Sequence, residues 1–273
     1  MALSFIRYHR SESPQECGHR RLERLRYGLA LCALLLCTAC RHSVQPRIVA
    51  IAAAADLKFA MDEISLGFHR AYPGAELRNS FGSSGNFYSQ LHNGAPFDAF
   101  LSADVEYPRM LLREGIGKAD SLFVYGVGRI VVWVPAASPL PAAGALLDAE
   151  VKHIAIANPQ HAPYGRAAEA ALRSMGLYDK LKPKLVLGED ISQTFEFVES
   201  GAADVGIVAL SLALAPAAHG KYWEIPLDAY PRIEQAGLIL KDSADTRALR
   251  AFLVGAEGRR ILKGYGFYLP ESR

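Results

Sequence analysis

The most informative absence in this 273-residue chain is that of cysteine after residue 40. All four cysteines lie within the first forty residues, at Cys17, Cys32, Cys37 and Cys40. A disulfide framework and catalysis by a thiol are therefore excluded for the body of the protein. The body also has no pair of histidines four residues apart, so metal ligation is only weakly indicated.

A long apolar run is missing from the N-terminal part. The uncharged stretch Gly28–Ala39 has 12 residues, whereas a membrane-spanning helix needs about 20. It follows a segment with six arginines, and this order is typical of a signal peptide. We therefore expect residues 1–40 to be a signal peptide. Because the basic segment is unusually long, the true start codon is expected to lie further downstream.

The end of this segment leaves two routes of processing open. Leu36–Cys40 resembles a lipobox, in which the final cysteine becomes the lipid-bearing N-terminus, although Cys37 stands where leucine is usual. The small Ala39 also suits ordinary cleavage by a signal peptidase. The sequence thus predicts a periplasmic protein, with lipid anchoring through Cys40 as one of the two outcomes.

The mature chain has no excess of positive charge. The whole sequence carries a net charge of +2, but residues 1–40 contribute six arginines and three glutamates, so the remainder has a net charge of −1. The basic character belongs to the leader. A nucleic-acid partner and a basic membrane-binding patch are therefore not indicated.

What remains alternates between strand and helix patterns. Arg47–Ala54 is a continuous apolar run, typical of a buried parallel strand. Asp56 opens a stretch with apolar residues at helical spacing. A strand at 75–80, a helix at 86–92, a strand at 99–101 and a helix at 104–114 follow, which favours a parallel sheet covered on both faces.

A second series of α/β units begins at Arg129–Pro135. About 230 residues are enough for two lobes with separate cores. We expect lobe 1 to comprise residues 45–127 and 236–273, and lobe 2 residues 128–235. Loops at the carboxyl ends of the strands of both lobes place a ligand cleft between them.

Four loops repeat one pattern: an apolar strand, a short polar turn and a helix start. Helix N-termini offer free N–H groups and the positive end of the helix dipole, so several of them around one cleft can bind a dianion without a cation. Ordinary helix capping is the alternative for each loop taken alone. The loops are Ala54–Asp56, Gly82–Gly85, Asn158–Gly165 and Gly188–Ile191.

Several motifs resemble those of periplasmic molybdate-binding proteins of ABC importers. Together they extend over about residues 47–268. They comprise Ala52–Leu57, Phe81–Gly85, Asn93–Asp98 with Leu101–Asp104, Asn158–Gly165, Gly201–Val208 and Gly264–Phe267. The resemblance implies a type-II periplasmic-binding fold, an α/β fold of two lobes with mainly parallel sheets. It also implies a molybdate or tungstate ligand, an inner-membrane permease as partner, a monomer, and no cofactor.

The resemblance also implies the ligand-binding residues. Asp56 stands where the family has a small hydroxyl or amide residue, and Ser84 matches the second serine of the family's turn. Tyr164 and Ile191 match positions that donate a backbone N–H. A tyrosine that other members carry after Gly-Ile-Val is replaced by Ala209, and the phenol of Tyr164 is expected to take its place.

Asp56 is the residue that departs most from the family pattern, because a carboxylate repels a dianion. Three interpretations stay open. Its side chain caps its own helix while its N–H binds the ligand; it accepts a proton from a protonated oxyanion such as phosphate or arsenate; or the pocket holds another kind of ligand.

A serine hydrolase is the main alternative from another class. Gly82–Gly85 does not match the Gly-x-Ser-x-Gly turn of such enzymes. A histidine base is also needed, and only His161 lies in a candidate loop, with no acid partner evident. We therefore predict a binding protein without catalytic residues. A lipoprotein that kept the fold for sensing or adhesion is a further alternative.

Overall fold

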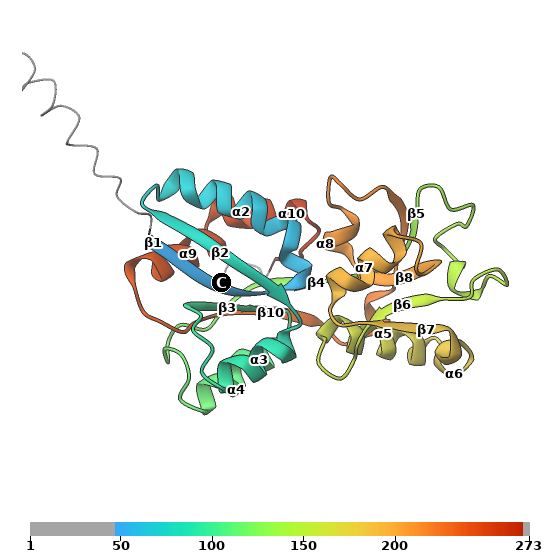
Figure 1. The fold of residues 1–273 in the computed structure, drawn as a ribbon, viewed down its shortest axis with the longest axis horizontal. Coiled ribbons are helices and arrows are strands. Elements are labelled where there is room, and N and C mark those ends of the chain that lie inside the picture. Colours follow the sequence, from blue (N-terminus) through green and yellow to red (C-terminus); the bar gives the residue numbers. More distant parts are fainter. Residues whose placement is uncertain (1–46, 270–273) are drawn as a thin grey trace, which may run out of the picture. The chain divides into compact units, whose positions relative to one another are not determined.

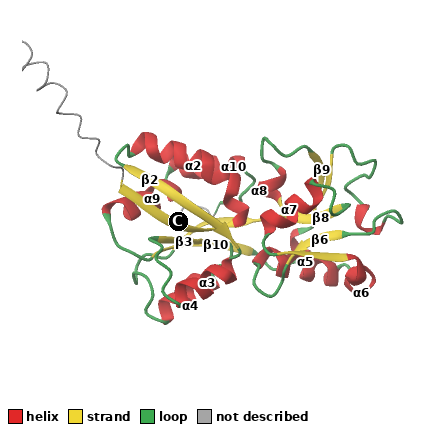
Figure 2. Cartoon of the chain, viewed as in Figure 1, coloured by secondary structure: helices red, strands yellow, loops and turns green. Residues whose placement is uncertain are grey.

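The computed structural model describes residues 47–269, which belong to one compact unit. The predicted signal peptide and Cys40 lie outside the described residues. None of the described helices is both long and apolar enough to span a bilayer. Two five-stranded sheets, each with helices on both faces, make up this unit (Figures 1 and 2).

The first sheet has the strand order β2-β1-β3-β10-β4. Helices α2, α9 and α10 lie on one face, and α3 and α4 on the other (Figure 1). The strands are β1 (Arg47–Ala54), β2 (Ala75–Gly82), β3 (Ala99–Ser102), β4 (Phe123–Gly128) and β10 (Ile233–Ile239). The helices are α2 (Lys58–Ala71), α3 (Ser84–His92), α4 (Glu106–Arg113), α9 (Ala244–Val254) and α10 (Ala256–Gly264).

Burial on both faces explains why β1 is apolar throughout. Ile51 belongs to the core formed with α2, α9 and α10, whereas its neighbour Ala52 belongs to the core under α3 and α4. Successive side chains of a strand point to opposite faces, so a strand covered on both sides has no position left for a polar residue.

The second sheet has the order β7-β6-β8-β5-β9. Its core includes Trp133 and Phe195, whose ring centroids are 4.7 Å apart. The strands are β5 (Ile130–Pro135), β6 (Ile154–Ala157), β7 (Leu185–Gly188), β8 (Val205–Ala209) and β9 (Gly220–Glu224). The helices are α5 (Pro163–Ser174), α6 (Tyr178–Leu181), α7 (Ile191–Glu199) and α8 (Leu210–Ala213).

The sheets are mixed, but four of the five strands in each run in the same direction, so the expectation of mainly parallel sheets is confirmed. In the first sheet β10 runs antiparallel to β3 and β4, and in the second sheet β5 runs antiparallel to β8 and β9. The remaining pairs are parallel. β4 and β9 were not predicted, and β10 begins three residues before the boundary predicted for lobe 1 at residue 236.

The chain passes between the sheets twice, once from β4 to β5 and once from β9 to β10. The parallel strands β1, β2, β6 and β7 are each followed by a turn and a helix. Turns at the carboxyl ends of parallel strands are where α/β folds bind ligands. These four turns contain the four predicted loops.

Candidate functional site

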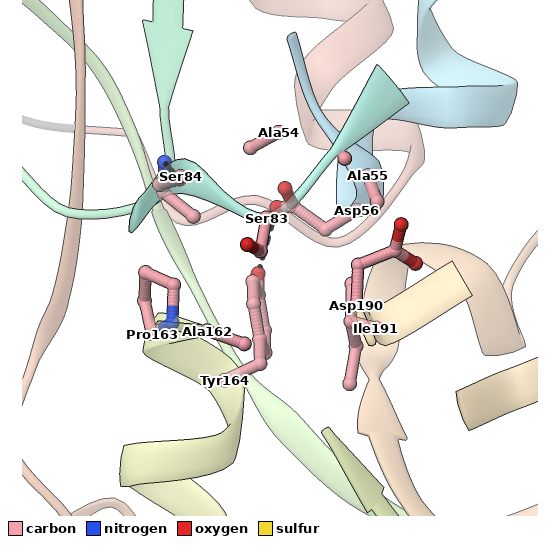
Figure 3. Close-up of a pocket in the computed structure, with 12 residues that line it drawn as sticks. Ala54, Ala55, Asp56, Ser83, Ser84, Ala162, Pro163, Tyr164, Asp190 and Ile191 are labelled. Atoms are coloured by element: carbon pink, nitrogen blue, oxygen red, sulfur yellow. Dashed lines mark hydrogen bonds between the residues drawn. The ribbon is translucent and has the colours of Figure 1, made fainter. Parts of the chain in front are cut away.

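The four predicted loops line a single small cavity. Figure 3 shows Asp56, Ser83 and Ser84 on one side of it and Tyr164 and Ile191 on the other. No lysine, arginine or histidine lines the cavity. Its lining residues are Ala54, Ala55, Asp56, Gly82, Ser83, Ser84, Ala103, Ala162, Pro163, Tyr164, Asp190 and Ile191.

Free amide groups at helix starts surround the cavity. A helix leaves its first N–H groups without partners in its own backbone. Ser84, Tyr164 and Ile191 occupy such positions, and their amides make no other hydrogen bond among the described residues. Because both lobes contribute a helix start, an anion here would meet several positive dipole ends at once.

Side-chain caps are present at two of the four helix starts. The Ser83 hydroxyl accepts a hydrogen bond from the N–H of Asn86, and the Asp190 carboxylate accepts from the N–H groups of Ser192 and Gln193. Capping uses the amides of the second and third helical positions and leaves the first amide free. The caps therefore orient the helix starts without occupying the N–H of Ser84 or Ile191.

All four predicted site residues line this cavity and are buried, with exposures of 1% for Asp56 and Ser84, 2% for Tyr164 and 3% for Ile191. The Ser84 hydroxyl accepts a 2.9 Å hydrogen bond from the N–H of Ala103. The hydroxyl proton of Ser84 is therefore free to point to a ligand. That these residues contact the ligand stays a prediction.

The Asp56 side chain does not cap its own helix, contrary to the first of the three interpretations. Residues 55–57 form a short 3₁₀ helix with no side-chain cap. Asp56 Oδ2 instead accepts hydrogen bonds from the Tyr164 hydroxyl at 2.8 Å and from Gln235 Nε2 at 2.6 Å. The side chain thus links the first lobe to α5 of the second lobe.

Burial controls the protonation of this cluster. It raises the pKa of Asp56 from 3.8 to about 6, against the opposing effect of the hydrogen bonds from Gln235 and Tyr164. Burial, and then the nearby Asp56 carboxylate, raises the pKa of Tyr164 and of Tyr125 well above 10.0. Both phenols therefore keep their protons at neutral pH.

The sequence led us to expect that the phenol of Tyr164 replaces the tyrosine missing at Ala209. This phenol is instead hydrogen-bonded to Asp56 and Gln235. It donates to Asp56 and accepts a 3.0 Å hydrogen bond from Gln235 Nε2. Two residues after Ala209, the Ser211 hydroxyl donates to the backbone oxygen of Asp56. The turn at Asp56 is therefore held from α8 as well as from α5.

Gln235 is the important residue that sequence reasoning missed. It is fully buried at 0% exposure in β10, where the other buried residues are apolar or glycine and the preceding Glu234 is only partly buried. The adjacent Glu234 hides the signal in the sequence, because a Glu-Gln pair gives no sign that the glutamine is buried. The amide nitrogen of Gln235 donates to Asp56 and to Tyr164, whereas its oxygen is buried and has no partner among the described residues.

Polar contacts join the two lobes around the cavity. Arg166 of α5 forms a 2.6 Å ion pair with Asp104, which follows β3. Asn86 of α3 donates to Glu189 at 2.6 Å, and the N–H of Gly85 donates to the backbone oxygen of His161. These contacts hold the two lobes together beside the cavity.

His161 does have an acid neighbour, which corrects the sequence expectation. Its Nδ1 lies 2.9 Å from the Ser83 hydroxyl oxygen, and its Nε2 lies 3.6 Å from a Glu189 oxygen. The order serine–histidine–glutamate resembles a catalytic triad. Ser83 is however the helix cap of α3, and the Glu189 side chain is more than half exposed.

Among the described residues, no group of three or more metal-ligating side chains could hold a metal ion.

Comparison with known proteins decides between a binder and an enzyme. Residues 49–268 match the family model of the bacterial extracellular solute-binding proteins. The chain belongs to this family. Two relatives carry the name molybdate-binding protein ModA: one from Rhodobacter capsulatus, 37% identical over 89% of this chain and 96% of its own length, and one from Azotobacter vinelandii, 39% identical over 86% and 94%. The predicted family is confirmed, and the hydrolase alternative is not favoured.

The solved structures agree on the fold. The periplasmic molybdate-binding protein of Azotobacter vinelandii has a TM-score of 0.76 and 33% identity, covering 82% of this chain and all of its own. A sulfate-binding protein from Mycobacterium tuberculosis has a TM-score of 0.65 at 13% identity, covering 82% of this chain and 88% of its own. The two-lobe type-II periplasmic-binding fold is therefore confirmed. At 13% identity, the second likeness concerns the fold alone.

Proposed function

We propose that the protein captures molybdate in the cavity between its lobes and delivers it to an inner-membrane ABC permease from the periplasm. The observation that carries the proposal is the convergence of free amides at Ser84, Tyr164 and Ile191 on one cavity without a cationic side chain. Neutral donors avoid the desolvation cost of a buried arginine and suit reversible capture. The names of the relatives support this ligand.

The proposal also covers the range of ligands, the oligomeric state and the bounds of the lobes. Tungstate has the shape and charge of molybdate and is proposed as a second ligand. We propose that selectivity over the smaller sulfate comes from the size of the cavity, because donors held at fixed positions can all reach the oxygens of an anion of one radius only. We also propose that the protein acts as a monomer and that its lobes comprise residues 45–127 with 236–273 and residues 128–235. For the N-terminal segment, both lipidation of Cys40 and ordinary cleavage after Ala39 stay open.

Titration of the purified protein by calorimetry tests this function. Molybdate and tungstate are expected to bind one to one, and sulfate, phosphate and arsenate at least about 100-fold more weakly, a difference of about 2.7 kcal/mol. Tight binding of phosphate or arsenate with none of molybdate would favour the alternative that the protein binds another oxyanion. No heat with any of the five would contradict the proposal.

Two substitutions test the binding residues. Ile191→Pro removes the N–H at the first position of α7, where proline is tolerated and Asp190 already has an extended backbone. Ser84→Ala removes a hydroxyl donor. Each is expected to weaken molybdate binding by at least about tenfold. Ile191→Val keeps the N–H and is the matched control; equal affinity of Ile191→Pro and Ile191→Val would contradict the assignment.

A further inference from the structure

One oxygen atom in the cavity lining has no partner. Asp56 Oδ1 is buried and makes no hydrogen bond among the described residues, although the other oxygen of the same carboxyl group makes two. Asp56 itself is 1% exposed and lines the cavity. Buried polar atoms are rarely left unpaired, so an unpaired one beside a cavity indicates that its partner is the ligand.

The hydrogen-bond pattern fixes where a proton on this carboxyl group would lie. Oδ2 accepts from two donors, the Tyr164 hydroxyl and Gln235 Nε2. In the orientation of the Gln235 amide seen here, its nitrogen faces Oδ2, and an amide nitrogen only donates. Oδ2 is therefore the carbonyl-like oxygen, and a proton would reside on Oδ1. In that form Asp56 is a hydrogen-bond donor to the ligand.

Among residues 47–269, no cation pairs with the carboxylate form of Asp56. The groups that face it from the neighbouring elements are neutral: Tyr164 of α5, Gln235 of β10, Ser211 of α8 and, further away, Tyr125 of β4. Two charged groups near the starts of the adjacent α2 and α7 have other partners: Lys58 pairs with Glu196, and the Asp190 carboxylate, which also lines the cavity, accepts from backbone amides.

We propose that Asp56 binds the oxyanion as a neutral carboxylic acid, donating from Oδ1, so that capture of each dianion takes up one proton from solution. This inference rests on the proposed function and adds a specificity-determining residue to it. A deprotonated Asp56 would place a second negative charge against the dianion at low dielectric. The protonated group takes the place of the hydroxyl or amide donor that relatives were expected to have at this position.

Uptake of a proton makes affinity depend on pH. Burial raises the pKa of Asp56 to about 6, so the acid form is present in the free protein below that pH and must be generated on binding above it. Molybdate affinity is expected to fall about tenfold for each pH unit above about 6, because one proton accompanies each ligand. Molybdate itself is a dianion throughout this range and contributes no proton.

Calorimetry in buffers of different ionisation enthalpy counts the proton directly. The purified protein is titrated with sodium molybdate at pH 5, 6.5 and 8. The wild type is expected to take up close to one proton per molybdate at pH 8 and much less than one at pH 5. Asp56→Asn supplies an amide N–H at the position of Oδ1 and needs no proton. Its affinity is expected to change less than about threefold between pH 6 and 8, against about 100-fold for the wild type.

A control comes from another carboxyl group whose pKa burial raises. Glu199 ends α7 and does not line the cavity. Glu199→Gln is expected to retain both the proton uptake and the affinity of the wild type. Equal proton uptake by the wild type and Asp56→Asn, or no uptake by the wild type at pH 8, would overturn the inference while leaving molybdate binding intact.

Titration with the other oxyanions gives two further outcomes that test the inference. If phosphate or arsenate binds at pH 8 without proton uptake and molybdate does not, Asp56 accepts a proton from the ligand and the inference is wrong. If none of these oxyanions binds, the proposed function fails and this inference fails with it.

Discussion

At the scale of single residues, Asp56 links the site to the stability of the protein. Its folded-state pKa lies above the ordinary 3.8, so its contribution to stability is complete below pH 3.8 and is lost as the pH rises through about 6. The difference between the two pKa values corresponds to roughly 3 kcal/mol. At neutral pH the ligand-free protein is therefore less stable, because the buried Asp56 carboxyl group is largely ionised.

Asp56→Asn is therefore expected to stabilise the ligand-free protein at pH 8 by up to about 3 kcal/mol and to have little effect at pH 4. The asparagine oxygen still accepts from Tyr164 and Gln235, so the cluster is retained. Urea unfolding of both proteins at the two pH values measures the difference. A stability difference that does not vary with pH would show that Asp56 is charged in the folded protein.

The residues of the site differ in how far they could be predicted. Ser83, Ser84, Asp190 and Ile191 follow from local chemistry, because turn and cap signals lie within a few residues of one another. The Asp56–Tyr164–Gln235 cluster does not, since its members are 71 to 179 positions apart. A long-range hydrogen bond has no local signal.

At the scale of elements, the end of β4 is shaped by the Asp56 cluster. A Cβ atom on Gly128 would lie 2.1 Å from the Tyr164 hydroxyl and 2.8 Å from Gln235 Nε2. Gly128 also ends β4, where the chain leaves the first sheet for the second. The close approach of backbone and cluster is possible only for a residue without a side chain.

Gly128→Ala is expected to destabilise the protein by about 1–3 kcal/mol, because the Tyr164 hydroxyl must move away from Asp56. Molybdate affinity is expected to fall with it. Thermal unfolding and calorimetry measure the two effects. Gly264→Ala is the control, since nothing lies within 4 Å of its added Cβ atom. Equal melting temperatures for the two variants would contradict the assigned role of Gly128.

The element-scale predictions failed where a strand carries glycine or polar residues. β4 contains Gly126 and Gly128, and β9 consists of the largely exposed residues 220–224. Neither has the apolar run of a buried strand. Each pairs with the one strand of its sheet that runs against the other four, β10 in the first sheet and β5 in the second.

At the scale of the whole molecule, side-chain contacts join the two lobes beside the cavity. Arg166 of the second lobe contacts both the Asp104 carboxylate and the Tyr107 hydroxyl of the first. Hinge closure of two lobes around a ligand removes water from the site and strengthens each hydrogen bond there. The contacts of Arg166 with Asp104 and Tyr107 are therefore expected to slow dissociation of the ligand.

Arg166→Gln is expected to weaken molybdate binding about three- to tenfold, mainly through faster dissociation, because a half-exposed ion pair contributes about 1 kcal/mol. Arg173→Gln is the matched control, since Arg173 lies on the same helix and pairs with Glu169 within that helix. Stopped-flow measurement of association and dissociation separates the two rates. A slower association with unchanged dissociation would argue against a role in closure.

The most direct test of the whole account is a crystal structure of the protein with molybdate. The account predicts one tetrahedral anion in the cavity, with oxygens about 3 Å from the amides of Ser84, Tyr164 and Ile191 and one oxygen facing Asp56 Oδ1. Molybdate bound elsewhere, or held in the cavity by side chains while these amides point away from it, would contradict the central claim.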